Sequence, residues 1–218
     1  MFSVRSVSAS ASASLDPIPD ASRRDPIKDQ LDSLIGDRRV LVFSGFSGLG
    51  YKDAASLDLK LNQLLDEASA DHGAHNLMVV AGATSDGIGR VYELASKKGI
   101  ATLGIVSEQA RGQASRDCHH VVYVPDPQNT WQVLDEKGSS YMVEVARNGG
   151  TFYALGGGSV TLGELNEAKA LGVKTQALPD FEPHPDQVAR RRAKDPEFDP
   201  TPVRTAHYAG RSPQGARV

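Results

Sequence analysis

The stretch "YALGGGSVTLGELNEAKALG", residues 153 to 172, carries an apolar segment directly into three glycines, a serine, a threonine and a glutamate. The apolar segment predicts a strand, and the residues after the glycines predict a helix. Glycines in such a connection let the backbone approach a ligand closely, and the N-terminus of the following helix favours negative charge. The stretch is therefore a candidate phosphate cradle, a candidate active site, or a turn.

The same succession of strand and helix recurs along the middle of the chain. Short apolar runs that alternate with longer amphipathic ones indicate a mostly parallel sheet with helices on both faces. The sequence therefore predicts a doubly wound, Rossmann-like α/β fold. The expected strands are 39–45, 77–82, 100–107, 120–126, 151–157 and 174–180, and the expected helices are 53–73, 85–99, 139–150 and 161–172.

Three connections that follow strands are rich in small and hydroxyl residues: "SGFSGLGYKD" at 44–53, "AGATSDGIG" at 81–89 and "GGGSVTLGE" at 156–164. In open parallel sheets, ligands bind beyond the carboxyl ends of the strands, where the strand order reverses. Three such loops at the carboxyl ends of parallel strands form a coherent rim for a phosphate-bearing ligand.

Several familiar motifs are excluded by single residues. A Walker loop needs lysine directly after its closing glycine, but Tyr51 follows Gly50. A dinucleotide fingerprint needs a third glycine where Thr161 stands, and a nucleophile elbow needs glycine where Leu49 stands. Ordinary ATPase, hydride-transfer and serine-hydrolase functions therefore lose support.

Composition narrows the classes of partner. The 218 residues carry a formal net charge of -3, without the basic excess of a nucleic-acid or membrane-surface binder. No apolar run is long enough to cross a bilayer. Cys118 is the only cysteine, which excludes an intramolecular disulfide and a cysteine-based zinc cage, and adjacent residues in "DCHH" at 117–120 cannot all converge on one ion. We expect a small-molecule or protein partner, no metal and no resident cofactor.

Both ends of the chain differ in composition from the middle. Residues 1–30 are rich in serine and alanine and predict a disordered tail, with an export or transit signal as the alternative. Residues 182–218 are dense in proline, charge and glycine and predict a solvated tail. The single domain is then 31–181, and a reducing, cytoplasmic location fits the lone cysteine best.

Taken together, the three loops resemble the nucleotide-binding superfamily that includes the Lonely Guy (LOG) proteins, often mislabelled lysine decarboxylases. The resemblance spans about residues 38 to 179. Laid on the family's PGGxGTxxE motif, Gly157, Gly158, Thr161 and Glu164 match, whereas Gly156 replaces the proline and Val160 the last glycine.

The resemblance implies a site. In the family's enzymes this loop holds a nucleoside 5′-monophosphate, and the glutamate assists cleavage of the bond between base and ribose 5-phosphate, which makes Glu164 the candidate catalytic carboxylate. The enzymes also carry an arginine on the preceding helix, and counting back places Tyr141 there instead. A homodimer is implied as well. The candidate phosphate ligands are Gly157, Gly158, Ser159 and Thr161, and the further candidate ligand contacts are Gly45, Ser47, Gly82, Ser85, Asp86 and Arg90.

Each of these residues has a purely structural alternative. Thr161 could be the N-cap of the last helix, with Glu164 completing a capping box three residues later. Ser47 and Ser85 could serve the chemistry of their turns, and Asp86 could start a helix.

Three functions therefore stay open. The first is hydrolysis of a nucleoside 5′-monophosphate, which the glutamate favours. The second is a non-catalytic sensor or carrier of a nucleotide or phosphorylated cofactor, which the missing arginine favours. The third is a partner-binding role of the two tails, with the α/β domain as scaffold.

Overall fold

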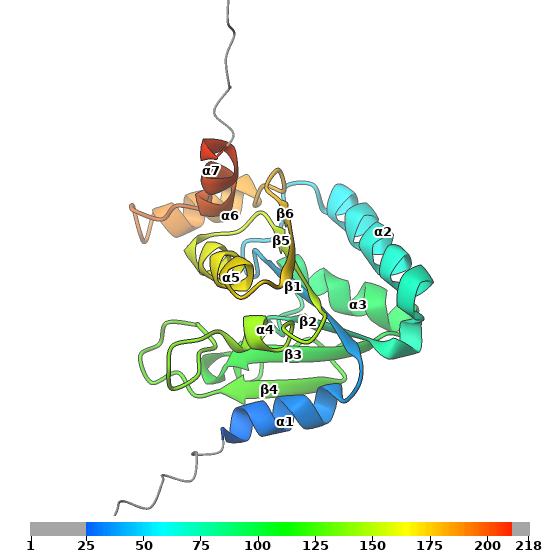
Figure 1. Cartoon of the computed structure of the whole chain (residues 1–218). Helices are drawn as coiled ribbons and strands as arrows, with labels where there is room; N and C mark the ends of the chain where they lie inside the picture. Colours follow the sequence, from blue (N-terminus) through cyan, green and yellow to red (C-terminus); the bar gives the residue numbers. More distant parts are fainter. Residues whose placement is uncertain (1–24, 211–218) are drawn as a thin grey trace, which may run out of the picture.

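The computed structural model describes residues 25–210, and its centre is a six-stranded, all-parallel sheet (Figure 1). The strands lie in the order β4-β3-β2-β1-β5-β6. Their bounds are β1 Arg39–Gly45, β2 Leu77–Ala81, β3 Ala101–Ser107, β4 His120–Val124, β5 Thr151–Leu155 and β6 Lys174–Leu178.

Helices cover both faces of this sheet (Figure 1). One core cluster joins the sheet to α2 and α3, and a second joins it to α1, α4, α5 and α7. The predicted doubly wound α/β fold is confirmed. The helices are α1 Pro26–Ile35, α2 Ala54–His72, α3 Arg90–Lys97, α4 Tyr141–Glu144, α5 Ser159–Ala170, α6 Pro185–Arg192 and α7 Pro202–Ala209, with short 3-10 turns η1 Ala74–Asn76, η2 Gly87–Gly89 and η3 Glu108–Ala110.

The central strand β1 explains why the predicted strands are continuous apolar runs. Its side chains alternate between the faces, so that Val40 and Val42 join the α5 side while Leu41 and Phe43 join the α2 side. Because helices cover both faces, all four of these positions are buried. After Arg39 at its start, β1 has small or polar residues only at its end, where Ser44 and Gly45 reach the open edge.

The strand order reverses between β1 and β5. The chain passes outward from β1 to β4, returns across the sheet, and adds β5 on the free side of β1. In register, Gly45 lies opposite Leu155, so the loops that follow β1 and β5 leave the sheet side by side. This is the type of crevice in which open α/β sheets bind ligands.

The helix predicted at 139–150 is shorter than expected. Only Tyr141–Glu144 is α-helical, and turns lead from it into β5. A β-carbon at Gly150 would lie 2.7 Å from the carbonyl oxygen of Val40 and 2.9 Å from Cα of Ala146. The chain therefore presses its backbone against β1 at this point, which a continued helix with side chains would prevent.

The structure departs from the predicted C-terminal tail. Residues 185–192 and 202–209 form α6 and α7, each with proline in its first turn. Val203 of α7 is 1% exposed and belongs to the core cluster around α5, and its N–H donates to the carbonyl oxygen of Gly157 at 3.4 Å. This buried valine and its backbone contact, together with the ion pair of Arg204 with Glu182 and the hydrogen bond from Tyr208 to Asp180, hold a segment whose composition suggests a solvated tail.

At the other end, α1 begins within the range predicted to be a tail. The N-cap Asp25 accepts hydrogen bonds from the N–H groups of Ile27 and Lys28 at 3.0 and 3.1 Å, and Leu31 and Ile35 are buried. The rest of the predicted N-terminal tail, 1–24, and residues 211–218 lie outside the described residues.

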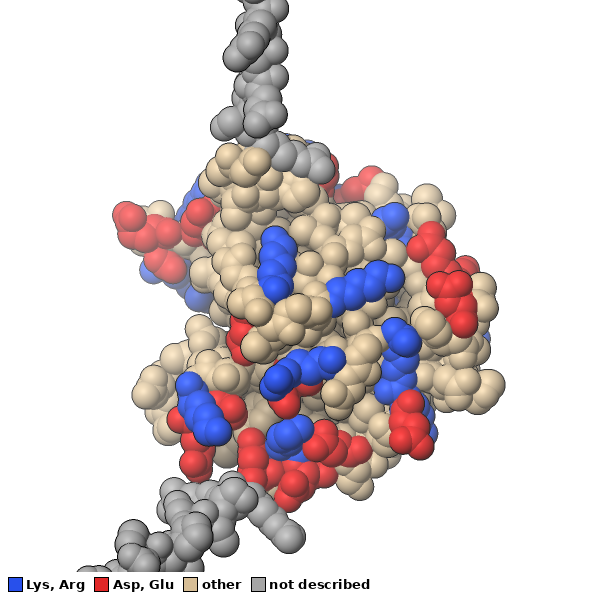
Figure 2. All heavy atoms as spheres, viewed as in Figure 1, with Lys and Arg blue, Asp and Glu red and all other residues tan. Residues whose placement is uncertain are grey.

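Figure 2 shows how charged side chains are distributed over one face of the described residues. On the face shown in Figure 2, basic and acidic side chains are interspersed. A binding face for a polyanion would gather lysine and arginine into one stripe. From Asp25 to Gly210, no helix is both long and apolar enough to span a bilayer.

We expect Val203→Ala to lower the free energy of unfolding by about 2 kcal/mol, because it removes two buried methyl groups from the contact between α7 and α5. The same substitution at the 40% exposed Val160 is the matched control and should cost less than about 0.5 kcal/mol. Urea denaturation of both variants measures the difference. Equal stabilities would show that α7 does not dock through Val203.

Candidate functional site

A cavity of about 590 Å³ opens at the crevice between β1 and β5. This volume is in the range of small-molecule sites. Three segments form its wall: the loop after β1, the first turn of α5, and the segment that leads from α6 into α7. The lining residues are Gly45, Phe46, Ser47, Leu49, Gly158, Ser159, Val160, Thr161, Asp195, Glu197, Phe198, Asp199 and Pro202.

The three consecutive glycines have different roles. Gly156 and Gly157 have positive φ angles of 59° and 117°, and added β-carbons would lie 2.1 Å from the carbonyl oxygen of Phe181 and 2.5 Å from Cβ of Thr161. These two glycines are required by the turn itself. Gly158 has φ -87°, and the nearest atom to an added β-carbon would be the carbonyl oxygen of Asp199 at 3.9 Å. The backbone does not require Gly158, whose missing side chain instead leaves the cavity open.

The first turn of α5 borders the same cavity. The helix begins at Ser159, and its N-cap Gly158 has no side chain to accept from the first N–H groups. Those groups have no partner within the helix and carry the positive end of its dipole. An anion in the cavity would satisfy them.

The capping-box alternative for Thr161 and Glu164 is wrong. Thr161 is the third residue of α5, because the helix begins two residues earlier than predicted. A threonine at that position cannot act as the N-cap, and Glu164 lies on the next turn.

Glu164 instead belongs to a hydrogen-bonded cluster behind the cavity wall. Its Oε2 accepts from the hydroxyl of Ser44 at 2.6 Å, and its Oε1 lies 3.4 Å from the hydroxyl of Ser140. Oγ of Ser44 is also 3.1 Å from Oγ1 of Thr161. Burial raises the pKa of Glu164 to about 7, with a smaller contribution from the charge of Glu167, while the two serine hydroxyls act in the opposite direction.

Tyr141, at the position where the resemblance places an arginine, faces another element. Its hydroxyl donates to Oδ2 of Asp25 at 2.7 Å, which ties α4 to the N-cap of α1. The side chain is 5% exposed. The structure therefore gives Tyr141 a structural role.

A second cavity, of about 630 Å³, lies on the other side of the β1 loop. It is lined by Thr84, Ser85 and Asp86 of the β2 loop, by residues 112–117, and by Gly48. Two of the predicted ligand contacts, Ser85 and Asp86, are thus brought together here. Gly82 lines neither cavity, and a β-carbon there would lie 3.9 Å from Oγ of Ser47.

Arg90, predicted as a ligand contact, is not brought to either cavity. Its guanidinium group binds both carboxylate oxygens of Asp58, at 3.0 and 2.6 Å, and lies 2.7 Å from Oε2 of Glu93. It therefore joins α3 to α2. The neighbouring glycines are structural too, because a β-carbon at Gly87 would lie 2.0 Å from the carbonyl oxygen of Phe46.

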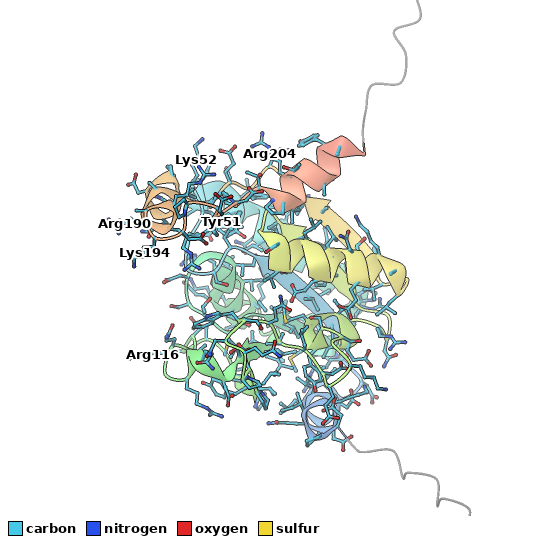
Figure 3. All side chains as sticks on the ribbon, turned by 90° about the vertical axis from the view of Figure 1, so that its left-hand side faces the viewer. Tyr51, Lys52, Arg116, Arg190, Lys194 and Arg204 are labelled. Atoms are coloured by element: carbon cyan, nitrogen blue, oxygen red, sulfur yellow. The ribbon has the colours of Figure 1, made fainter. Side chains whose placement is uncertain are left out.

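Basic residues at the carboxyl edge lie outside the predicted set of ligand contacts. Figure 3 looks onto this edge, with Arg116 on one side and Arg190 and Lys194 on the other. Arg116 lines the second cavity, and within residues 25–210 it makes no salt bridge. Lys52 and Arg204 both pair with Glu182. The only sequence signal for Arg116 is one basic residue in the polar stretch "GQASRD".

Cys118 and the histidines beside it do not form a metal site. Among the residues that the structure describes, no group of three or more His, Cys, Asp or Glu side chains could hold a metal ion. Burial raises the pKa of Cys118 to about 11, so this thiol stays protonated near neutral pH.

Comparison with known proteins adds likenesses to solved structures. No family model matches the chain, and no curated protein matches it. Two structures of the Moco carrier protein from Chlamydomonas reinhardtii are 17% identical, with a TM-score of 0.46, over 80% of this chain and 96% of theirs. The structure of TM1055 is 19% identical, with a TM-score of 0.45, over 70% of this chain and 81% of that one.

The raised pKa of Glu164 predicts how stability depends on pH. Between the ordinary value of 4.5 and about 7, the folded state binds the proton more strongly than the unfolded state does. This group therefore stabilises the fold fully below pH 4.5, and about 3 kcal/mol of that stabilisation is lost as the pH rises to 7. We expect Glu164→Gln to remove this slope in urea denaturation between pH 5 and pH 8.

Glu136→Gln, at an exposed position of the same charge, is the control for the loss of a carboxylate. The control should keep the slope of the parent protein. A parent-like slope in Glu164→Gln would show that Glu164 is ionised throughout this range.

Proposed function

We propose that the chain binds a phosphorylated, nucleotide-like small molecule, with the phosphate at the N-terminus of α5. The observation that carries the proposal is the uncapped first turn of α5, which opens through Gly158 into a cavity of about 590 Å³ at the point where the strand order reverses. Phosphate groups suit such a turn because they accept several N–H hydrogen bonds at once.

The remainder of the ligand would extend over the β1 loop toward the second cavity. Ser47 and Leu49 line the first cavity, and Gly48 between them lines the second. Gly48 has no atom within 4 Å of an added β-carbon, so the loop is open to a ligand at this point. Arg116 would then supply positive charge at the far end.

The acidic wall favours a ligand of low charge that carries hydroxyl groups. Asp195, Glu197 and Asp199 line the first cavity opposite the turn of α5. Carboxylates bind ribose hydroxyls and repel additional phosphate groups. A nucleoside monophosphate satisfies both conditions better than a triphosphate does.

Binding without catalysis is the form of the proposal that the site supports best. Glu164 does not line the cavity, and its carboxylate is held by Ser44 and Ser140. Tyr141 binds Asp25 and supplies no positive charge at the site. A sensor or carrier needs the phosphate cradle alone.

Hydrolysis of the bond between base and ribose is the second candidate. The observation in its favour is the pKa of Glu164, which at about 7 lies near the optimum for exchanging a proton at neutral pH. The homodimer implied by the LOG resemblance, and the tail-mediated partner role, remain predictions.

The cradle is tested by Gly158→Asp. An aspartate at the N-cap can accept from the N–H groups of α5 and so occupies the anion site while it stabilises the helix. We expect AMP to raise the melting temperature of the parent protein, and this shift to be absent in the variant. Gly163→Asp adds the same charge at an exposed position of α5 and should keep the shift. Loss of the shift in both variants, or in neither, would contradict the proposal.

The catalytic alternative is tested by the release of free adenine from AMP, measured by chromatography. Turnover by the parent protein that Glu164→Gln lowers by a factor of about 100 or more would establish hydrolysis and assign the glutamate. We expect no release above the uncatalysed background, with AMP binding intact.

A further inference from the structure

Three oxygen-bearing side chains connect the interior of the protein to the wall of the cavity. Oγ of Ser44 lies 2.6 Å from Oε2 of Glu164 and 3.1 Å from Oγ1 of Thr161. Thr161 lines the cavity, whereas Ser44 and Glu164 do not. Ser44 is 8% exposed, Thr161 is 4% exposed and Glu164 is partly buried, so bulk water does not freely replace the contact between Ser44 and Thr161.

The direction of this chain depends on one proton. A serine hydroxyl has a single hydrogen, so Ser44 donates to one neighbour and accepts from the other. When Glu164 is ionised it can only accept, so Ser44 donates to it and Thr161 donates to Ser44. Thr161 then presents only lone pairs to the cavity.

Protonation of Glu164 reverses every bond in this chain. The carboxylic acid donates to Ser44, Ser44 donates to Thr161, and the hydroxyl hydrogen of Thr161 becomes free to point into the cavity. A phosphate oxygen needs a donor, not an acceptor. The same site is therefore receptive to an anion in one state and unreceptive in the other.

We propose that Glu164, Ser44 and Thr161 form a proton relay that couples binding of a phosphate at the N-terminus of α5 to protonation of Glu164. This inference rests on the proposed function and specifies its regulation. Glu164 and Ser44 are positioning residues, because only Thr161 meets the ligand. Ser140 lies 3.4 Å from Oε1 of Glu164 and leaves Oε2 to Ser44.

The groups around Glu164 allow it to titrate near neutral pH. Burial raises its pKa to about 7, and the charge of Glu167 adds to this rise. The pKa of Glu167 is itself raised, mainly by burial and further by the charges of Asp135 and Glu144. β1 contributes only the neutral Ser44 at this end, and α4 contributes Tyr141 and Glu144. The C-terminal segment contributes Asp195, Glu197 and Asp199 at the cavity wall, and α7 carries Arg204, paired with Glu182, and His207.

The sign of the coupling follows from linkage. Anion binding favours the protonated acid, so the pKa of Glu164 rises in the complex and binding takes up a proton. Below pH 7 Glu164 is already protonated, so the affinity for the anion does not change further with pH. Above pH 7 the affinity should fall, by at most tenfold for each pH unit, until the pKa of the complex is reached.

Isothermal titration calorimetry with AMP between pH 7 and pH 9 tests the relay, because the phosphate of AMP, with a second pKa of about 6, is fully charged there. Titrations in two buffers of different ionisation heat count the protons taken up. For the parent protein we expect the affinity to fall at least fivefold from pH 7 to pH 8.5, with uptake of close to one proton at pH 8.

Variants separate the relay from a simple charge effect. Ser44→Ala keeps the carboxylate but breaks the chain, and should bind AMP without pH dependence or proton uptake. Glu164→Gln can donate an amide hydrogen to Ser44 at every pH, and should bind at pH 8.5 about as tightly as the parent does at pH 7. Thr161→Ser should keep the pH dependence, whereas Thr161→Val should lose it and bind more weakly throughout. Circular dichroism confirms that each variant is folded.

The outcomes distinguish the two levels of the proposal. Absence of AMP binding at every pH would overturn the proposed function and the relay with it. Binding that is independent of pH in the parent protein would overturn the relay alone. A pH dependence that persists in Ser44→Ala would also overturn it, since the carboxylate would then act on the phosphate through space.

Discussion

The hydroxyl of Tyr51 fixes the geometry on which the rest of the site depends. It donates to the carbonyl oxygen of Leu155 at 2.8 Å and accepts from the N–H of Phe46 at 3.1 Å. It thereby ties the β1 loop to the end of β5, on the two strands between which the order reverses. The ring is 6% exposed and packs edge-on against Phe46 and Phe181. A β-carbon at Gly45 would lie 2.2 Å from this hydroxyl, so the glycine is required by the contact.

The charge that the cavity can accept depends on the groups that line it and on which of them already have partners. The N–H groups and the helix dipole of α5 place positive charge at Gly158, while Asp195, Glu197 and Asp199 line the same cavity. Asp199 is partly engaged, because its Oδ1 accepts from the N–H and the hydroxyl of Thr201. These two hydrogen bonds hold its pKa below the ordinary value. An anion at α5 therefore meets fixed backbone dipoles and a negative wall, which limits how much charge the site accepts.

The architecture could be predicted from the sequence because the four inner strands, β3, β2, β1 and β5, are buried on both faces. Continuous runs such as "RVLVF" and "LMVVA" have few other interpretations once helical segments separate them. The glycine loops could be placed at one edge for the same reason. Which glycine matters to a ligand could not be predicted, since "GGG" gives Gly156, Gly157 and Gly158 equal weight, and only the backbone angles and neighbouring atoms separate turn from cavity.

Contacts between distant segments could not be predicted from the sequence, for a different reason. Arg90 looks like a free cation beside a glycine loop, but α2 brings Asp58 to it, 32 positions away. Ser44 is only a small residue at a strand end until α5 places Glu164 against it, 120 positions away. Val203 is the buried residue of α7, but it lies in a stretch whose composition predicts a solvated tail, and nothing in that stretch marks it as buried. Side chains that pair across the fold leave no local pattern.

Two features of α5, its start at Gly158 and its residue Glu164, each lower the stability of the fold. The helix begins without a side-chain cap, which leaves its first N–H groups without a partner in the helix. It also holds a partly buried acid whose ionised form is disfavoured. A sequence selected for stability alone would place serine or aspartate at Gly158 and an apolar residue at Glu164. α7 offsets part of this cost, because Val203 packs against α5 and its N–H satisfies the carbonyl of Gly157. Local rules are broken at Gly158, which faces the cavity, and at Glu164 behind its wall, and the C-terminal helix stabilises the turn that precedes them. This distribution is expected where a site has been preserved against the preference of the fold.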